Sequence, residues 1–267
     1  ELELQYSPSR WSHRMSADEV IKAHERALKE TDKARALAQT LLNVPYGEGD
    51  GEKLDVYIPS TNSLMPLVIY IHGGYWQFLK EESGFMAVPL VSKGVVVVAV
   101  DYDIAPKNMD LIVSQVRKSV VSVVQQYSHI GLFICGHSAG AHLAAMVLST
   151  DWSQYSITPQ IKAFLVSGIY DLLPIVSTYV NEPLKMTEVA IRNSPTTLIQ
   201  QLKSSSSGCH IVVAVAEHDS PEFRLQSEEY YKMLEASGLN VMLENVPNTD
   251  HFNIIELLVD EEYHLTK

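Results

Sequence analysis

Short apolar strands that alternate with helical segments constrain the fold of this 267-residue chain more than any other feature. Two of the strands, Leu67 to Ile71 and Val95 to Val100, are continuous apolar runs, a pattern typical of strands that are buried on both faces. Beyond them, periodic apolar spacing predicts a helix from about Asp110 to Tyr127. Buried strands separated by helices predict an α/β fold, in which helices cover both faces of a mostly parallel sheet.

The other predicted elements continue this alternation. Further strands are expected at Leu54 to Ile58, Ile130 to Cys135, Ile161 to Ser167, Ile211 to Ala216 and Asn240 to Val246, and further helices at Ala139 to Ser149, Pro221 to Ser237 and Phe252 to Tyr263. The segment of about residues 16–43 is predicted to be helical, with a capping box from Ser16 to Glu19. The less regular stretch of about residues 172–203 is predicted to be a small helical cap within a single domain, residues 1–267.

Charge and composition argue against several classes of protein. The net charge of −12 disfavours nucleic acid or an anionic membrane as the main partner. The longest apolar runs are far shorter than the roughly 20 residues that cross a bilayer. Cys135 and Cys209 are predicted to be buried free thiols, which favours a reducing compartment. We recognise no secretory leader, although a removed segment stays open because the chain does not begin with methionine.

The pentapeptide GHSAG, Gly136 to Gly140, lies between a predicted strand and an alanine-rich predicted helix. In this context the G-x-S-x-G pattern makes a sharp turn that exposes the serine hydroxyl above the edge of the sheet. Ser138 is therefore the predicted nucleophile of a serine hydrolase. The alternative is a glycine-rich turn in which Ser138 only caps the helix. His137 is expected to point away from the serine.

The sequence HGGYW, His72 to Trp76, follows the predicted strand Leu67 to Ile71, upstream of this turn in the chain. Glycines in such a loop allow the backbone amides to turn inward toward a reacting carbonyl. We expect an oxyanion hole formed by the N–H groups of Gly74, Tyr75 and Ala139. His72 is expected to brace the loop, and the rings of Tyr75 and Trp76 are candidate substrate contacts. The alternative is a glycine turn beside two core aromatic residues.

The general base and its acid partner should follow the serine in the order acid, then histidine. His251 lies on the loop between the last predicted strand and the last predicted helix, which makes it the predicted base. Asp219, after the preceding strand, is the favoured acid. Glu217 and Asp171 remain alternatives, whereas Asp250 is too close to His251 in the chain to orient its ring.

Together these motifs resemble the kynurenine formamidase (arylformamidase) family of the α/β-hydrolase superfamily. The resemblance rests on HGGYW, on GHSAG, and on the tripeptide Asp250 to Phe252. The stretches Tyr6 to Trp11 (YSPSRW) and Ser167 to Leu172 (SGIYDL) are also similar, so that the resemblance spans nearly the whole chain.

The resemblance implies an α/β-hydrolase fold and the hydrolysis of N-formyl-L-kynurenine to L-kynurenine and formate in tryptophan degradation. The family's triad falls on Ser138, Asp219 and His251, and its usual setting is the cytosol. We expect no cofactor and no metal, because the chain has no HExxH motif or comparable cluster.

Two other classes of protein stay open. One is a general carboxylesterase of the hormone-sensitive-lipase type, and the other is a catalytically silent relative that only binds its ligand. The expected partner is a small-molecule substrate, and a homodimer is an open alternative to a monomer. Tyr170, Asn181 and Phe252 are further candidates, chosen by position, for contacts with the amino acid end of a substrate.

Overall fold

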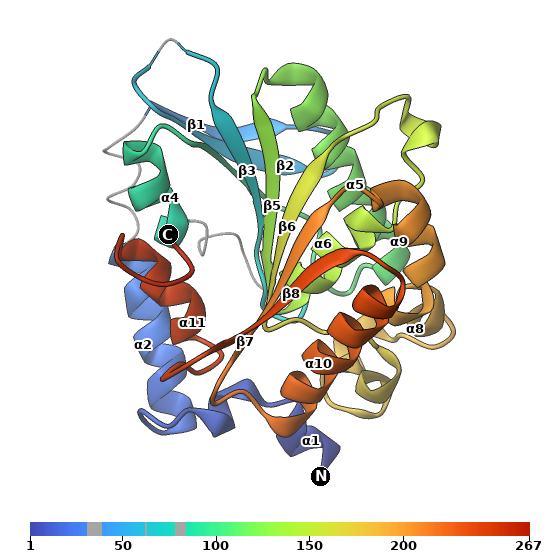
Figure 1. Ribbon diagram of the computed structural model, residues 1–267. Helices are drawn as coiled ribbons and strands as arrows, with labels where there is room; N and C mark the ends of the chain where they lie inside the picture. Colours follow the sequence, from blue (N-terminus) through green and yellow to red (C-terminus); the bar gives the residue numbers. More distant parts are fainter. Residues whose placement is uncertain (31–38, 62, 78–83) are drawn as a thin grey trace.

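The computed structural model describes residues 1–30, 39–61, 63–77 and 84–267. Its centre is an eight-stranded sheet with the strand order β1-β2-β4-β3-β5-β6-β7-β8 (Figure 1). The strands are β1 (Gln39–Pro45), β2 (Lys53–Ile58), β3 (Pro66–Ile71), β4 (Val96–Val100), β5 (Gly131–His137), β6 (Ile161–Val166), β7 (His210–Ala216) and β8 (Asn240–Val246). The pairs β1–β2 and β2–β4 are antiparallel and the other pairs are parallel, so the predicted α/β fold is confirmed.

Helices lie on both faces of the sheet. The longer ones are α2 (Ala17–Glu30), α4 (Gly84–Ser92), α5 (Met109–Gln126), α6 (Ala139–Leu148), α9 (Ile199–Ser206) and α10 (Pro221–Ala236). Short helices are α1 (Leu2–Gln5), α7 (Asn181–Leu184), α8 (Val189–Arg192) and α11 (Asn253–Glu256). Short 3₁₀ segments are η1 (Pro8–Trp11), η3 (Trp152–Tyr155), η4 (Leu173–Ser177), η5 (Pro195–Thr197) and η6 (Leu257–Val259). Figure 1 shows α5, α6, α9 and α10 on one side and α2, α4 and α11 on the other.

The apolar strands supply side chains to two separate hydrophobic layers. On β3, Ile69 packs in the layer that contains α5, α6 and α10, whereas Tyr70 packs in the layer that contains α4 and α11. On β4, Val98 packs in the first of these layers and Val97 packs in the second. Because each face of the strand meets a helix layer, neither face needs polar residues, which explains the continuous apolar runs.

The predicted helix of residues 16–43 is wrong in its second half. Helix α2 ends at Glu30, residues 31–38 lie outside the described residues, and β1 begins at Gln39. Pairing of β1 with β2 outweighs the local helical spacing, as tertiary context often does. The predicted capping box is present: the Ser16 N–H donates to Glu19 Oε2 (3.2 Å) and the Glu19 N–H donates to Ser16 Oγ (3.4 Å).

The last predicted helix is also shorter than expected. Instead of reaching Tyr263, helix α11 ends at Glu256 and gives way to η6 and to turns, in which Asp260 accepts from the Glu262 N–H. Such local side-chain hydrogen bonds compete with helix continuation. Helix α4 was not predicted, because its residues are apolar all round and it contains Pro89. Its sequence therefore lacks the one-sided spacing that marks a surface helix.

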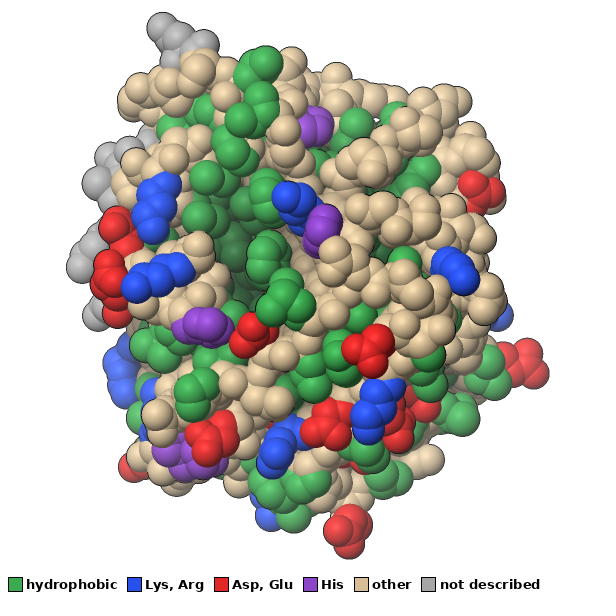
Figure 2. Space-filling view, in the orientation of Figure 1, with side chains coloured by type: hydrophobic (Ala, Val, Ile, Leu, Met, Phe, Trp, Pro, Cys, Tyr) green, Lys and Arg blue, Asp and Glu red, His purple; other side chains and the backbone are tan. Residues whose placement is uncertain are grey.

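Beside the short last helix, an apolar groove lies on the face of the sheet that α4 and α11 cover. The groove has a volume of about 510 Å³, and its lining includes Val68, Phe133 and Phe164 from the sheet and Leu258 and Leu265 from the end of the chain. Figure 2 shows hydrophobic side chains gathered in a hollow on this side of the molecule.

The stretch between β6 and β7 consists of the short elements η4, α7, α8, η5 and α9, and its assignment as a cap stays a prediction. Cys135 and Cys209 are buried and are not joined in a disulfide, as predicted. In the part of the chain that the structure describes, no helix is long and apolar enough to cross a membrane.

Candidate active site

Ser138 lies at a sharp turn between β5 and α6, with φ 57° and ψ −119°. A positive φ at a residue other than glycine is strained and persists only where the surroundings enforce it. The two flanking glycines allow this turn. A Cβ atom on Gly136 would lie 2.2 Å from the Gly140 carbonyl oxygen, and a Cβ atom on Gly140 would lie 2.0 Å from the Ile71 carbonyl oxygen. The turn therefore depends on glycine at both positions.

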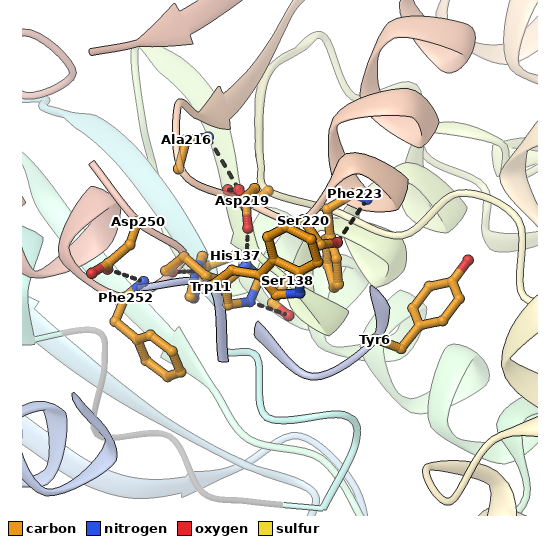
Figure 3. A network of polar contacts seen from close by, with 12 residues as sticks. Tyr6, Trp11, His137, Ser138, Ala216, Asp219, Ser220, Phe223, Asp250 and Phe252 are labelled. Atoms are coloured by element: carbon orange, nitrogen blue, oxygen red, sulfur yellow. Dashed lines mark hydrogen bonds and ion pairs between the residues drawn. The ribbon is translucent and has the colours of Figure 1, made fainter. Parts of the chain in front are cut away.

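A chain of hydrogen bonds connects Ser138 to Asp219 through the imidazole of His251 (Figure 3). The distance from His251 Nε2 to Ser138 Oγ is 3.0 Å, and the distance from His251 Nδ1 to Asp219 Oδ1 is 2.7 Å. All three side chains are buried. Asp219 follows β7 and His251 follows β8, so that loops at the carboxyl ends of the strands bring the three predicted residues together.

The second carboxylate oxygen of Asp219 is also bound. Ser167 Oγ donates to Asp219 Oδ2 (2.6 Å), and the Ala216 N–H donates to the same atom (3.1 Å). Ser167 directly follows β6, is fully buried and has a φ of 47°. The role of Ser167 was not predicted from the sequence, although a serine at the end of a buried strand was a signal. Because both oxygens of Asp219 are bound, its carboxylate has one fixed orientation toward His251.

The His251 ring is enclosed by other rings. Phe223 on α10 meets it edge-on at 4.9 Å between ring centroids, and His137 lies at 4.9 Å. Instead of contacting the serine, His137 Nε2 donates to the backbone carbonyl of His251 (2.8 Å). The half-buried ring of Phe252 lies at 5.7 Å. These contacts hold the His251 ring in position, and none of them could be predicted from local sequence.

The HGGYW loop passes beside the nucleophile. A Cβ atom on Gly73 would lie 3.0 Å from Ser138 Cβ. The next three residues, Gly74, Tyr75 and Trp76, have positive φ values of 91°, 49° and 59°. Among the described backbone hydrogen bonds of turns and loops, none uses the N–H groups of Gly74 or Tyr75 as donors.

The third predicted donor of the oxyanion hole, the Ala139 N–H, lies in the first turn of α6. Amides in this position have no acceptor within their own helix. His72 braces the HGGYW loop, as expected. Its Nδ1 donates to the Gly73 carbonyl (2.9 Å), and its ring stacks on Tyr102 at 4.3 Å.

The predicted substrate contacts lie in different environments. The Trp76 ring is fully buried and meets His142 edge-on at 5.2 Å, so it belongs to the core rather than to a pocket wall. Tyr170 is also fully buried. The Asn181 amide donates to the backbone carbonyls of Val176 and Met186, which is a structural role. Tyr75 is partly exposed, and its hydroxyl donates to the Tyr6 carbonyl (2.7 Å).

The other acidic candidates bind elsewhere. Asp171 accepts from the Leu173 N–H at the start of η4, and Glu217 accepts from the Asn248 N–H. Asp250 accepts from Arg14 Nε (2.7 Å) and is not a partner of the His251 ring in the described contacts. In the described ranges of the chain, no group of three or more His, Cys, Asp or Glu side chains is placed to hold a metal ion.

Residues 1–14, which we call the N-terminal strap, cross the sheet at the carboxyl ends of its parallel strands (Figure 1). Figure 3 shows Trp11 of the strap in front of the triad residues, with Tyr6 to one side. The Trp11 Nε1 donates to the Leu4 carbonyl (2.9 Å), which holds the indole within the strap.

A parallel sheet with antiparallel strands at one edge, and a strained serine between β5 and α6, define a hydrolase of the α/β-hydrolase class.

Comparisons with known proteins identify the family. The BD-FAE family model matches residues 54–203, more than half of the chain. Kynurenine formamidase of Salmo salar is 79% identical over 100% of this chain and 94% of its own length. That of Danio rerio is 73% identical over the same shares. A solved structure from Silicibacter sp. TM1040, named as a candidate thioesterase, has a TM-score of 0.81 at 27% identity and covers 99% of this chain and 98% of its own. The chain belongs to the kynurenine formamidase family.

Proposed function

We propose that this protein hydrolyses N-formyl-L-kynurenine to L-kynurenine and formate, with Ser138 as nucleophile, His251 as general base and Asp219 as the acid that orients the base. The observation that carries the proposal is the buried Ser138–His251–Asp219 hydrogen-bond chain in a member of the kynurenine formamidase family. The nucleophile and base are in hydrogen-bond contact, and a third group orients the base, which is the arrangement that nucleophilic catalysis requires.

The first half of the reaction would form a formyl ester on Ser138. As Ser138 Oγ attacks the formyl carbon, His251 Nε2, at 3.0 Å, accepts the hydroxyl proton. The carbonyl oxygen then carries the negative charge, and the N–H groups of Gly74, Tyr75 and Ala139 are our proposed donors to it. Each donor of this kind typically lowers the barrier by about 3–4 kcal/mol. His251 next gives its proton to the departing arylamine nitrogen, and the C–N bond breaks.

The second half would release formate. Water attacks the formyl ester while His251 accepts one of its protons, and Ser138 regains its proton as the ester bond breaks. An arylamine is a better leaving group than an alkylamine, because the ring delocalises the nitrogen lone pair. A site with esterase-like groups can therefore cleave this amide. A formyl group also needs little space on the acyl side of the serine.

The test compares Ser138→Ala with Ser220→Ala, because both serines are buried in the same region. Ser220 only caps α10 by accepting from the Phe223 N–H, so its loss should lower stability rather than remove chemistry. We expect kcat on N-formyl-L-kynurenine to fall by about 10⁴-fold or more in Ser138→Ala and to change little in Ser220→Ala.

The carboxylesterase alternative is tested with the wild-type protein. A kcat/KM for p-nitrophenyl acetate far above that for N-formyl-L-kynurenine would overturn the proposed substrate while leaving the triad intact. Failure of Ser138 to react with a fluorophosphonate would instead favour a binding protein without catalysis. A cytoplasmic location is part of the proposal, supported by the two cysteines, which are not joined in a disulfide. A homodimer stays a prediction, which sedimentation analysis would test.

A further inference from the structure

The N-terminal strap contacts two loops that belong to the proposed machinery. Its Tyr6 receives a hydrogen bond from Tyr75 of the HGGYW loop, and its Ser12 and Arg14 bind Asp250, the residue before His251. These loops are far apart in the chain and meet only at the carboxyl ends of the strands. A single short segment is thus attached to the loop of the oxyanion hole and to the loop of the base.

The first attachment concerns a strained residue. Tyr75 has a φ of 49°, and its neighbours on both sides also have positive φ values. For a bulky side chain this conformation is strained and persists only when other contacts enforce it. The hydrogen bond from the Tyr75 hydroxyl to the Tyr6 carbonyl, at 2.7 Å, is such a contact. Burial raises the pKa of the Tyr75 hydroxyl well above its usual value, so it remains a donor at neutral pH.

The acceptor of this hydrogen bond is itself held in place. Tyr6 is fully buried, and its ring packs against Phe223 at 6.0 Å. Its hydroxyl donates to Glu222 Oε1 (3.1 Å) and accepts from Gln226 Nε2 (2.7 Å), both on α10. The Tyr6 carbonyl therefore has a position that is set by α10, the helix whose Phe223 also contacts the His251 ring.

The second attachment fixes the base loop. Asp250 Oδ2 accepts from Ser12 Oγ (2.7 Å) and Arg14 Nε (2.7 Å), and Arg14 also donates to Oδ1 (3.2 Å). Oδ1 further accepts from the N–H groups of Phe252 and Asn253, which follow His251. Burial opposes ionisation of Asp250, but these hydrogen bonds together lower its pKa to about 2. Asp250 precedes His251 in the chain, and its ionised side chain binds the backbone that follows His251.

We propose that the N-terminal strap is a positioning element of the active site, which holds the oxyanion loop through Tyr6 and Tyr75 and the base loop through Arg14 and Asp250. The strap does not touch the reacting atoms in this account. It keeps the Tyr75 N–H and the His251 ring in a fixed relation to Ser138. The inference rests on the proposed function, because that function defines the roles of the two loops.

Tyr75→Phe tests the first attachment, and Tyr179→Phe is its matched control. The Tyr179 hydroxyl approaches the same Tyr6 carbonyl at 3.5 Å, but from an exposed position outside the HGGYW loop. The Phe variant of Tyr75 keeps the ring and the backbone amide. Loss of the tether should lower kcat about tenfold with KM nearly unchanged, whereas the control should stay within about twofold of wild type. Thermal unfolding of both variants establishes that they are folded at the assay temperature.

Arg14→Gln tests the second attachment, and Arg192→Gln is its matched control. Both arginines bind an aspartate through two nitrogens, but Arg192 pairs with the partly exposed Asp110 away from the triad. We expect about a tenfold loss of kcat in Arg14→Gln, again with little change in KM, and about a twofold change or less in Arg192→Gln. If Tyr75→Phe does not fold, this pair of variants decides the question.

The rate of covalent labelling by a fluorophosphonate separates the two proposals. This reagent forms a phosphonate ester on Ser138 with loss of fluoride, and its phosphoryl oxygen gains negative charge where the oxyanion of the natural reaction would lie. Labelling should therefore slow in Tyr75→Phe and in Arg14→Gln. If the wild type is labelled but does not hydrolyse N-formyl-L-kynurenine, the proposed substrate fails and labelling still tests the strap. Wild-type kcat and labelling rates in both strap variants, or equal losses in their controls, would overturn the inference.

Discussion

The nucleophile turn and the base loop are built in opposite ways. Ser138 is held by its own neighbours, because Gly136 and Gly140 allow β5, β3 and α6 to approach closely. His251 is held by residues that are distant in the chain, including Asp219, His137 and Phe223 around its ring and backbone. The turn is therefore readable as a five-residue motif, whereas the base loop exists only once the whole sheet has formed. Variants in the two regions should fail in different ways.

The largest expected effect is a loss of chemistry without a loss of fold, at Asp219, the distant residue that binds the ring of the base. Asp219→Asn keeps the size of the side chain but favours the wrong tautomer of His251. We expect kcat on N-formyl-L-kynurenine to fall by about 10³- to 10⁴-fold, with a much smaller change in thermal stability. A rapid-quench or absorbance assay together with calorimetry measures both quantities. Activity within tenfold of wild type would show that Asp219 is not the acid partner.

A variant in the nucleophile turn should instead lose both fold and activity. A Cβ atom on Gly140 would meet the backbone carbonyls of Ile71 and His72, which cannot move aside as a flexible side chain can. Gly140→Ala should therefore lower the free energy of unfolding by about 3 kcal/mol and slow labelling of Ser138. Gly94→Ala is the control, since Gly94 has a φ of 82° and no atom within 4 Å of the added Cβ. Its cost should be about 1 kcal/mol, from backbone strain alone.

His142 connects the nucleophile turn to Asn193, and its titration should make the stability of the protein depend on pH. It is buried one turn after Ser138 and hydrogen-bonds to the Asn193 carbonyl (2.7 Å). Burial lowers its pKa from 6.5 to about 4. The unfolded chain therefore binds a proton first as the pH falls, and stability should decrease between pH 6.5 and 4 by roughly 3 kcal/mol.

His142→Gln keeps a donor for the Asn193 carbonyl but does not titrate. Urea unfolding at several pH values should show a flatter curve between pH 6.5 and 4 in this variant. Protonation of Asp250, whose pKa is about 2 in the folded protein, also lowers stability, but it does so below pH 4. This loss of stability should be the same in the wild type and the variant. Parallel curves for the wild type and the variant would show that folding does not lower the pKa of His142.

The smallest expected effect concerns Ser167, which orients Asp219 from behind. Ser167→Gly removes the hydroxyl that donates to Asp219 Oδ2 and also tolerates the positive φ at this position. We expect kcat to fall about tenfold and the free energy of unfolding to fall by about 1 kcal/mol, because the buried carboxylate loses one of its donors. If Ser167 acts through Asp219, the same substitution should have little further effect in the Asp219→Asn background. An equal tenfold loss in that background would assign Ser167 a separate role.

The same contrast explains which features were predictable from the sequence. Strands β2 to β8 were predicted from the sequence, and so was the contact of Ser138, His251 and Asp219, because each follows from a local pattern or from chain order. Strand β1 and the N-terminal strap were missed because long-range pairing and hydrogen bonds define them. Ser167 was missed for the same reason: its partner Asp219 is on another strand's loop. The Trp76 ring was placed at a pocket wall because a motif does not reveal which side of a loop is buried.

The most direct test of the account is a competition experiment on the nucleophile. The protein is incubated with a fluorophosphonate, with and without N-formyl-L-kynurenine, and the modified peptide is identified by mass spectrometry. We expect one adduct per chain on Ser138, slower labelling when the substrate is present, and loss of hydrolysis in proportion to labelling. Hydrolysis of N-formyl-L-kynurenine that persists after complete modification of Ser138, or an adduct on another residue, would contradict the account.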